Sequence, residues 1–237
     1  MGKPLNLAGK IIFFSGNTTM NFETARFNMI EQQIRPWNVL DNEILDLLNK
    51  VHREDFVPKA YKNNALSDFE IPLGNGELML PPRLEARFLQ ALNIQPHEAV
   101  LEIGTGSGYM TALLAHQALR VFSVDIDQKI SQEAGIKLAA HDISNVTLEI
   151  GDGANGWDAH APYDVIFVSG STPKLSGKFE LSLNINGRLL AVVGDEPSMQ
   201  VMLITRTGEK AFTREVLFET VVPALQNAPQ PARFIFE

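Results

Sequence analysis

Apolar residues recur at intervals of three and four positions in two segments near the N-terminus, residues 22–34 and 44–51. This spacing predicts two amphipathic helices, because residues three and four apart lie on the same face of an α-helix. Pro36 separates the two segments, and Asp41 is well placed to cap the second helix. A third, shorter helical pattern covers residues 83–92. We expect this part of the chain to form a helical cap on the rest of the fold.

The pattern changes near residue 99, where short runs rich in β-branched residues alternate with helical periodicity. Helices are predicted at residues 110–118 and 128–140, and strands at residues 99–103, 120–125, 146–150, 163–169 and 188–194. Two further apolar runs, 199–205 and 212–222, flank a polar turn and predict an antiparallel hairpin. Strands that alternate with helices predict an α/β fold with a mostly parallel sheet covered on both faces, here of seven strands.

Residues 56–82 contain four prolines and the turn Leu73-Gly74-Asn75-Gly76, so we expect mostly loop there. A loop of this length is usually functional or disordered. Residues 1–19 show no clear periodicity, and we expect an extension that is disordered or derived from cloning. The rest is expected to form one structural unit, with a helical and loop region, 20–98, and a sheet region, 99–237.

Composition excludes several classes of function. The net charge is −8 at pH 7, and an acidic chain binds nucleic acid poorly because that affinity depends on Lys and Arg. The chain has no cysteine, which excludes disulfides, thiolate metal sites and cysteine nucleophiles. No apolar run approaches the ~20 residues that span a membrane. We therefore expect a cytoplasmic protein with no nucleic-acid or membrane partner.

Few side chains suggest acid–base or metal chemistry. The histidines have no spacing typical of metal ligands and are expected to be ordinary surface or helix-end residues: His52, His97, His116, His141 and His160. A Gly-x-Ser-x-Gly motif is also absent, which disfavours a hydrolase. The sequence therefore predicts neither a metal site nor a general base.

A glycine-rich turn follows the predicted strand 99–103. It reads Gly104-Thr105-Gly106-Ser107-Gly108 and precedes a helix, and ligands of parallel sheets bind beyond the carboxyl ends of the strands. A dinucleotide fingerprint would place glycine at position 109, but Tyr109 is there. The turn lets the backbone approach a ligand closely, and the alternative is that it is only a tight connection between strand and helix.

Two acids follow the next two strands. Asp125 could accept hydrogen bonds from both ribose hydroxyls of an adenosine, and Asp152 could accept one from the adenine amino group while Gly153 leaves room for the ring. Each acid alone could be a solvated loop residue or a cap. Together they predict an adenosine cleft. Glu102, a charge within an apolar strand, is expected to bond to the glycine loop or to water near the cofactor.

These motifs resemble a known family. Residues 100–109, Asp125 and the turn Gly151-Asp152-Gly153 resemble the S-adenosylmethionine site of class I methyltransferases. From about residue 29 to 223 the chain more narrowly resembles the protein-L-isoaspartate O-methyltransferase family. The closer resemblance is carried by REDFVP (53–58), AY (60–61), IPLG (71–74), GDGANGW (151–157), APYD (161–164) and GRLL (187–190).

The resemblance implies a Rossmann-like class I methyltransferase fold, S-adenosyl-L-methionine as cofactor, and carboxyl methylation of isoaspartyl residues in damaged proteins, a protein-repair reaction. The acceptor carboxylate is ionised at neutral pH, so the reaction needs no general base. The resemblance further implies cofactor-binding roles for Glu102, Gly104, Thr105, Gly106, Ser107, Gly108, Asp125, Ile126, Asp152 and Gly153.

The chain departs from the family in the acceptor loop. The family usually reads Gly-Gln-Thr-Ile-Ser before a proline, whereas this chain has leucine at both hydroxyl positions, in Gly76-Glu77-Leu78-Met79-Leu80-Pro81. The family's serine is thought to hold the acceptor carboxylate, and such a bond is worth roughly 1.5–3 kcal/mol. Substitute donors could be Arg83, Ser169, Ser171 or Thr172, although the last three could instead cap a helix.

Two alternatives to isoaspartyl methylation therefore stay open. One is a methyltransferase with a less polar acceptor, and the other is a cofactor-binding protein that transfers no methyl group. If Leu78 and Leu80 line the acceptor pocket, isoaspartyl methylation is expected to be weak or absent. Replacement of the two leucines by Thr and Ser is expected to raise it.

Overall fold

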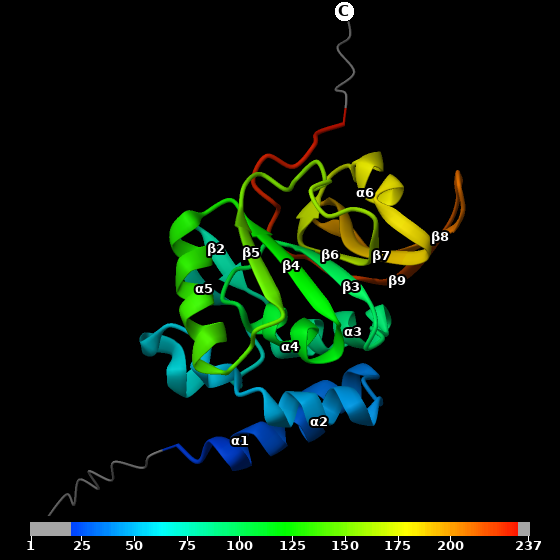
Figure 1. Cartoon of the computed structure of the whole chain (residues 1–237). Helices are drawn as coiled ribbons and strands as arrows, with labels where there is room; N and C mark the ends of the chain where they lie inside the picture. Colours follow the sequence, from blue (N-terminus) through cyan, green and yellow to red (C-terminus); the bar gives the residue numbers. More distant parts are fainter. Residues whose placement is uncertain (1–19, 232–237) are drawn as a thin grey trace, which may run out of the picture.

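A seven-stranded sheet forms the centre of the computed structural model, which describes residues 20–231 (Figure 1). The extension expected at residues 1–19 lies outside the described residues. The strand order is β5-β4-β3-β6-β7-β8-β9, with parallel pairing from β5 to β7 and antiparallel pairing of β8 and β9. The bounds are Ala99–Ile103 (β3), Arg120–Asp125 (β4), Val146–Ile150 (β5), Tyr163–Thr172 (β6), Leu183–Asp195 (β7), Ser198–Gly208 (β8) and Ala211–Glu219 (β9). The predicted α/β fold with a terminal hairpin is confirmed.

Alternate residues of the strands enter hydrophobic clusters on opposite faces of the sheet, because side chains point to alternate faces along a strand. On β4, Val121 belongs to the larger cluster, whereas Phe122 and Val124 belong to the smaller one. The smaller cluster includes Phe179 of α6, Gly177–Leu181. The larger cluster includes residues of α3 (Pro82–Leu92), α4 (Tyr109–Gln117) and α5 (Gln128–Ala140).

The N-terminal helices lie beyond α3 and α4, on the side away from the sheet (Figure 1). They are α1, Phe22–Met29, and α2, Asn42–Lys50, and they contribute buried side chains to the larger cluster. The Asp41 carboxylate accepts a hydrogen bond from the backbone N–H of Glu43 at 2.8 Å, which confirms the predicted cap. The helix predicted at residues 22–34 continues after α1 as a π-helical turn, Ile30–Ile34, because the backbone N–H of Arg35 bonds to the carbonyl of Ile30.

The segment expected to be mostly loop, residues 56–82, is about half regular structure. It contains a 3-10 helix, Lys59–Asn64, and a two-stranded hairpin of β1, Ile71–Gly74, and β2, Glu77–Met79. The hairpin turn has positive φ angles of 52° at Asn75 and 85° at Gly76. Two such residues match the twist of a two-residue hairpin, so the predicted turn closes a pair of strands that were too short to detect.

The sheet has its reversal of strand order at β3, because the chain continues from β3 to β4 on one side and later returns to β6 on the other. In open α/β sheets, ligands bind beyond the carboxyl ends of the strands at this point.

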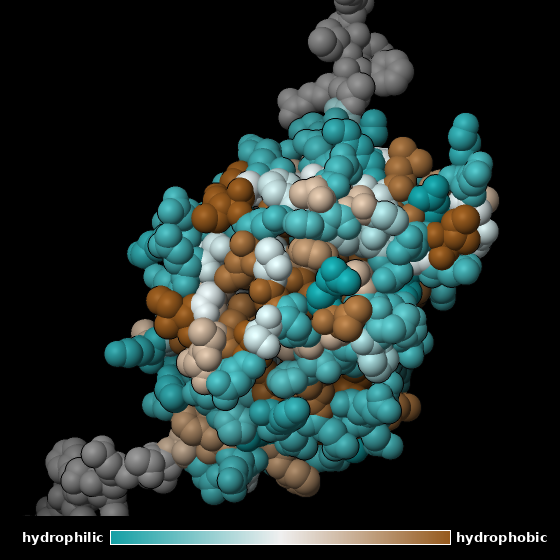
Figure 2. Space-filling view, in the orientation of Figure 1, coloured by the Kyte–Doolittle hydropathy of each residue, from teal (hydrophilic) through white to brown (hydrophobic). Residues whose placement is uncertain are grey.

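The edge strand of the sheet, β5, is only partly covered by other residues. Apolar residues gather in the middle of the face shown in Figure 2, where Figure 1 draws β4 and β5. Within residues 20–231, no helix combines the length and apolar content that crossing a membrane requires.

Candidate functional site

The glycine loop between β3 and α4 lies against β6. Gly104 has a φ of +91°, and a Cβ there would lie 2.1 Å from Oγ of Ser169. Oγ of Ser169 in turn donates to the carbonyls of Ile103 and Gly104, at 2.8 and 3.1 Å. The backbone conformation therefore requires glycine at this position, and a side chain there would also displace the Ser169 hydroxyl from its hydrogen bonds.

Asp125, at the end of β4, fastens the same loop. Its Oδ2 accepts a hydrogen bond from the backbone N–H of Gly106 at 2.9 Å, and its Oδ1 accepts one from the N–H of Asp127 at 2.9 Å. The side chain is 8% exposed. Each carboxylate oxygen has a second lone pair, so Asp125 can still accept hydrogen bonds from two ligand hydroxyls.

Asp152 follows β5 and also has partners on both oxygens. Oδ1 accepts from the backbone N–H of Ala154 at 3.0 Å, and Oδ2 accepts from the side-chain amide of Asn227 at 3.0 Å. Next to it, a Cβ on Gly153 would lie 2.8 Å from the side chain of Ile103. The turn after β5 is therefore packed closely against the end of β3.

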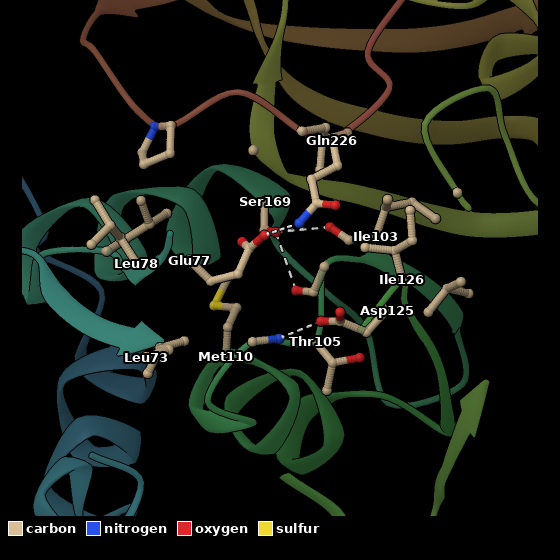
Figure 3. A pocket seen from close by; sticks show the side chains of 18 of the residues that line it. Leu73, Glu77, Leu78, Ile103, Thr105, Met110, Asp125, Ile126, Ser169 and Gln226 are labelled. Carbon is tan, nitrogen blue, oxygen red and sulfur yellow. Dashed lines mark hydrogen bonds between the residues drawn. The ribbon is translucent and has the colours of Figure 1, made fainter. Parts of the chain in front are cut away.

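These strand ends meet in one pocket, which encloses about 930 Å³ of space, part of it open to solvent (Figure 3). Eight of the ten predicted cofactor residues line it: Gly104, Thr105, Gly106, Ser107, Asp125, Ile126, Asp152 and Gly153. The acceptor-loop residues Leu78 and Leu80 line the same pocket, as does Ser169. The remaining candidates do not line it: Glu102, Gly108, Pro81, Arg83 and Ser171.

Glu102 lies behind the pocket and is fully buried. Its Oε2 accepts hydrogen bonds from the hydroxyls of Thr111 and Ser123, at 2.5 and 2.6 Å, and its Oε1 has no partner within the described residues. Burial raises the pKa of this carboxyl to about 8. The Ser123 hydroxyl is also 2.7 Å from that of Thr105. Glu102 therefore reaches the glycine loop through one intervening hydroxyl.

Gly108 serves packing between helices. It precedes α4 with a φ of +82°, and a Cβ there would lie 3.3 Å from the Cα of Ala134 on α5. A backbone atom cannot move aside as a side-chain end can. Glycine at this position therefore lets α4 begin close to α5.

The pocket is acidic. Its charged lining side chains are Glu77, Glu85, Asp125 and Asp152, and no Lys, Arg or His of residues 20–231 lines it. Burial raises the pKa of Glu85 to about 7, although the neighbouring Arg53 opposes this shift. In the described part of the chain, no group of three or more His, Cys, Asp or Glu could hold a metal ion. A glycine cradle with acids around it fits a nucleoside that carries a positive charge, as S-adenosylmethionine does on its sulfonium.

Comparison with known proteins agrees with this geometry. The family model described as Protein-L-isoaspartate(D-aspartate) O-methyltransferase matches residues 24–228. The chain belongs to this family. It is 37% identical over 185 residues to Protein-L-isoaspartate O-methyltransferase 1 of Syntrophobacter fumaroxidans, covering 78% of this chain and 86% of the relative.

Solved structures of the protein-L-isoaspartate O-methyltransferase family share the fold. One matches with a TM-score of 0.72 at 22% identity, over 86% of this chain and 66% of its own longer chain. A second, from Plasmodium falciparum in complex with S-adenosyl-L-homocysteine, matches with a TM-score of 0.72 at 16% identity, over 87% of this chain and 99% of its own. Both likenesses concern the fold, and they confirm the predicted fold class.

Arg53 supports the acceptor loop of this protein-L-isoaspartate O-methyltransferase family member from the protein interior. It belongs to the stretch 53–58 that carries part of the resemblance. Arg53 is fully buried, and it donates to the carbonyls of Ala65 and Leu80 at 2.9 and 2.5 Å. It also forms a buried ion pair with Glu85 on α3. Arg53 therefore links the carbonyl of Leu80, at the end of the loop, to Glu85 on α3.

The substitute donors considered for the family's serine are engaged elsewhere. Arg83 forms an ion pair with Asp68 and lies over the ring of Trp37, 4.5 Å from its centroid. The hydroxyl of Ser171 donates to the carbonyl of Val222 at 3.0 Å, and that of Thr172 donates to the carbonyl of Lys174 at 2.7 Å. Ser169 lines the pocket, but its hydroxyl donates to the glycine loop.

The sequence analysis missed the C-terminal part of the site. Residues 223–226 line the pocket together with Glu85, Met110 and Phe167. Residues 223–226 reach the pocket because the backbone of Ala224 pairs with that of Ser171 at the end of β6. No local pattern in residues 223–226 signals this placement.

Proposed function

We propose that this chain is an S-adenosylmethionine-dependent methyltransferase that esterifies the isoaspartyl carboxylates of proteins or peptides. One observation carries the proposal: the glycine cradle and the family's acceptor loop line one pocket. All of Leu78, Leu80, Gly104 and Asp125 line it, and Figure 3 shows Leu78 on one side and Asp125 on the other. A methyl donor and an acceptor bound on these two sides would be neighbours. The comparisons support the isoaspartyl acceptor over the two alternatives.

Gly104, Gly106, Asp125, Asp152 and Gly153 would hold the cofactor. S-adenosylmethionine supplies an electrophilic methyl group, and transfer to a carboxylate oxygen forms an O–CH₃ bond while the S–CH₃ bond breaks and its electron pair stays on sulfur. The chain's own contribution is placement and exclusion of water. Leu78, Leu80 and Met110 give the acceptor side an apolar lining, which suits that role.

The acceptor is a carboxylate that is ionised at neutral pH, so no protein group has to remove a proton from it. This agrees with a pocket that lacks histidine among its described lining residues. We propose that Asp125 accepts from the ribose hydroxyls and that Asp152 accepts from the adenine amino group. Both carboxylates are oriented by backbone N–H groups, which reduces the entropy lost on binding.

The test is transfer of a radiolabelled methyl group to a peptide that contains one isoaspartyl residue. The control is the same peptide with a normal aspartyl residue, and the product is recognised as an ester because alkali releases its label as methanol. We expect labelling of the isoaspartyl peptide alone, with inhibition by S-adenosylhomocysteine. Binding of S-adenosylhomocysteine without labelling of either peptide would refute the proposed acceptor.

A further inference from the structure

Gln226 enters the pocket from a C-terminal strap, defined here as residues 221–228. The strap is fixed to β6 by Ser171, whose backbone N–H donates to the carbonyl of Pro223 at 2.8 Å and whose carbonyl accepts from the N–H of Leu225 at 2.9 Å. Figure 3 shows the side chain of Gln226 pointing from this segment toward Glu77 and Ser169. The strap therefore presents Gln226 at the acceptor side of the pocket.

The amide of Gln226 is oriented by Glu77 of the acceptor loop. Nε2 of Gln226 donates to Oε1 of Glu77 at 2.7 Å. A carboxylate that faces an amide can be paired only with its NH₂ end, so this contact decides which end of the amide faces the loop. The nitrogen carries two hydrogens, and only one has a partner among residues 20–231. One N–H thus remains available.

Other side-chain donors around the acceptor loop are engaged or absent. The side chains of Leu78 and Leu80 have no polar atoms, and the hydroxyl of Ser169 donates to the carbonyls of Ile103 and Gly104. The hydroxyl of Thr105 is paired with that of Ser123, and the described lining contains no cation. The hydroxyl of Ser107 lies in the glycine loop, where it accepts from the backbone N–H of Tyr109. On the side of the pocket that carries Leu78, the free N–H of Gln226 is the side-chain donor that can meet a negative charge.

We propose that Gln226 binds the acceptor carboxylate in place of the hydroxyls that leucine replaces at positions 78 and 80. The amide nitrogen then bridges two carboxylates, with one hydrogen on Glu77 and the other on the acceptor. This inference rests on the proposed function, and it moves a substrate contact from the acceptor loop to the C-terminal strap. It assigns Glu77 the role of a positioning residue.

The test compares Gln226→Leu, which keeps the size of the side chain and removes the amide, with Gln230→Leu as the matched control. Gln230 is exposed, and within residues 20–231 its side chain bonds only to the carbonyl of Ala228, at 3.4 Å. Two readouts are KM and kcat for the isoaspartyl peptide. A third, independent of turnover, is the anisotropy of the same peptide carrying fluorescein, with the protein saturated by S-adenosylhomocysteine. Calorimetry of S-adenosylhomocysteine binding checks the cofactor side.

Gln226→Leu should raise KM and the peptide Kd roughly tenfold, the lower range for one hydrogen bond to a charged group at an exposed site. Cofactor affinity should not change, and Gln230→Leu should match the unmodified protein. Adding Leu78→Thr to Gln226→Leu should recover part of the loss, because the loop then regains a donor.

Three results would overturn the inference in distinguishable ways. If Gln226→Leu methylates the peptide with unchanged KM and Kd, the inference fails while the proposed function stands. If the unmodified protein binds S-adenosylhomocysteine but neither binds nor methylates the peptide, the proposed function fails and the inference with it. A loss of cofactor affinity with an unchanged peptide Kd would assign Gln226 to the shape of the strap and also refute its contact with the acceptor.

Discussion

The guanidinium of Arg53 donates a hydrogen bond to the backbone carbonyl of Leu80, with 2.5 Å between Nη2 and the oxygen. A second bond goes to the carbonyl of Ala65, and the ion pair with Glu85 completes the set. All of these groups are removed from water. If Arg53 were replaced, the two carbonyls and the Glu85 carboxylate would stay buried without the bonds that offset the cost of their desolvation. The conformation of the acceptor loop therefore depends on the guanidinium of Arg53, which does not line the pocket.

Arg53→Met should lower the free energy of unfolding by about 3–5 kcal/mol at pH 8, the range for removing one member of a buried ion pair. The loss should be smaller at pH 6, because the pKa of Glu85 is already about 7 beside Arg53 and rises further without it, so the carboxyl left alone binds a proton more readily at pH 6 than at pH 8. Urea denaturation at the two pH values measures both effects. Arg120→Met, at an exposed position, is the matched control.

The double variant Arg53→Met with Glu85→Leu sharpens this prediction. Replacement of a whole buried pair by apolar residues is often neutral, so the double variant should recover most of the stability lost in Arg53→Met. If it is no more stable than Arg53→Met, the carbonyl bonds to Leu80 and Ala65 matter more than the ion pair.

Asp125→Ala should weaken binding of S-adenosylhomocysteine by about 1–3 kcal/mol, the scale for lost hydrogen bonds to a charged acceptor. The same change releases the backbone N–H groups of Gly106 and Asp127, so unfolding should also become easier. Calorimetry and urea denaturation separate the two effects, with the exposed Asp46→Ala as control. Unchanged affinity, or tight binding of NADH instead, would contradict the assignment of the pocket.

Most of the fold could be predicted because its signals are local. The predicted bounds 99–103, 120–125 and 146–150 coincide with β3, β4 and β5, whose β-branched runs end at glycine, aspartate or polar residues. Strand β7 extends beyond its prediction, to Leu183–Asp195, because pairing with β6 and β8 continues past the apolar run. Periodicity also cannot distinguish an α-helical turn from the π-helical turn at Ile30–Ile34.

The candidate site also has one part that local sequence predicts and another that only the tertiary fold brings together. The glycine loop and Asp125 are close in sequence to the strands that position them, so their meeting follows from sheet topology alone. Gln226 is 149 positions from Glu77, and only the tertiary fold brings the two together. A charge within a strand marked Glu102 as unusual, but the pattern could not tell that its carboxyl faces Thr111 and Ser123 behind the pocket.

Glu102 should make stability fall as pH rises. Burial raises the pKa of its carboxyl from 4.5 to about 8, so between these values the folded protein binds a proton that the unfolded chain does not. This contribution is fully present below pH 4.5 and is lost as pH rises through about 8. Thermal unfolding from pH 5 to 9 should show a steeper decline for the unmodified protein than for Glu102→Gln. Parallel curves would mean that the carboxyl is ionised throughout.

Glu77→Gln should strengthen binding of the isoaspartyl peptide. Glutamine can still accept the hydrogen bond from Gln226, but it removes a negative charge from beside the acceptor carboxylate. Near the dielectric constant of water, which suits charges about 5 Å apart at the open side of the pocket, the gain is about 0.5–1 kcal/mol, a KM lower by roughly two- to fivefold. The difference should shrink in high salt. Glu209→Gln, at an exposed position, controls for net charge. A higher KM would show that the Glu77 charge helps the acceptor.

Leu78→Thr and Leu80→Ser together should raise methyl transfer to the isoaspartyl peptide at a cost in stability. Both leucines line the pocket, but Leu80 is only 7% exposed and packs in the hydrophobic core, whereas Leu78 is half-buried. Leu80→Ser removes buried apolar volume, so the double variant should lose about 2–4 kcal/mol of unfolding free energy.

Leu78→Thr alone should lose less than half as much stability and isolate the effect of one added donor. A hydroxyl there could share the acceptor carboxylate with Gln226, and one such bond is worth roughly 1.5 kcal/mol, about a tenfold rise in kcat/KM. The measurement is kcat/KM below the unfolding transition, with S-adenosylhomocysteine affinity as the check on folding. If both variants bind the cofactor normally and neither gains activity, the pocket already holds the carboxylate as firmly as hydroxyls would. The two leucines would then be a local variation in packing, with Gln226 sufficient as the donor.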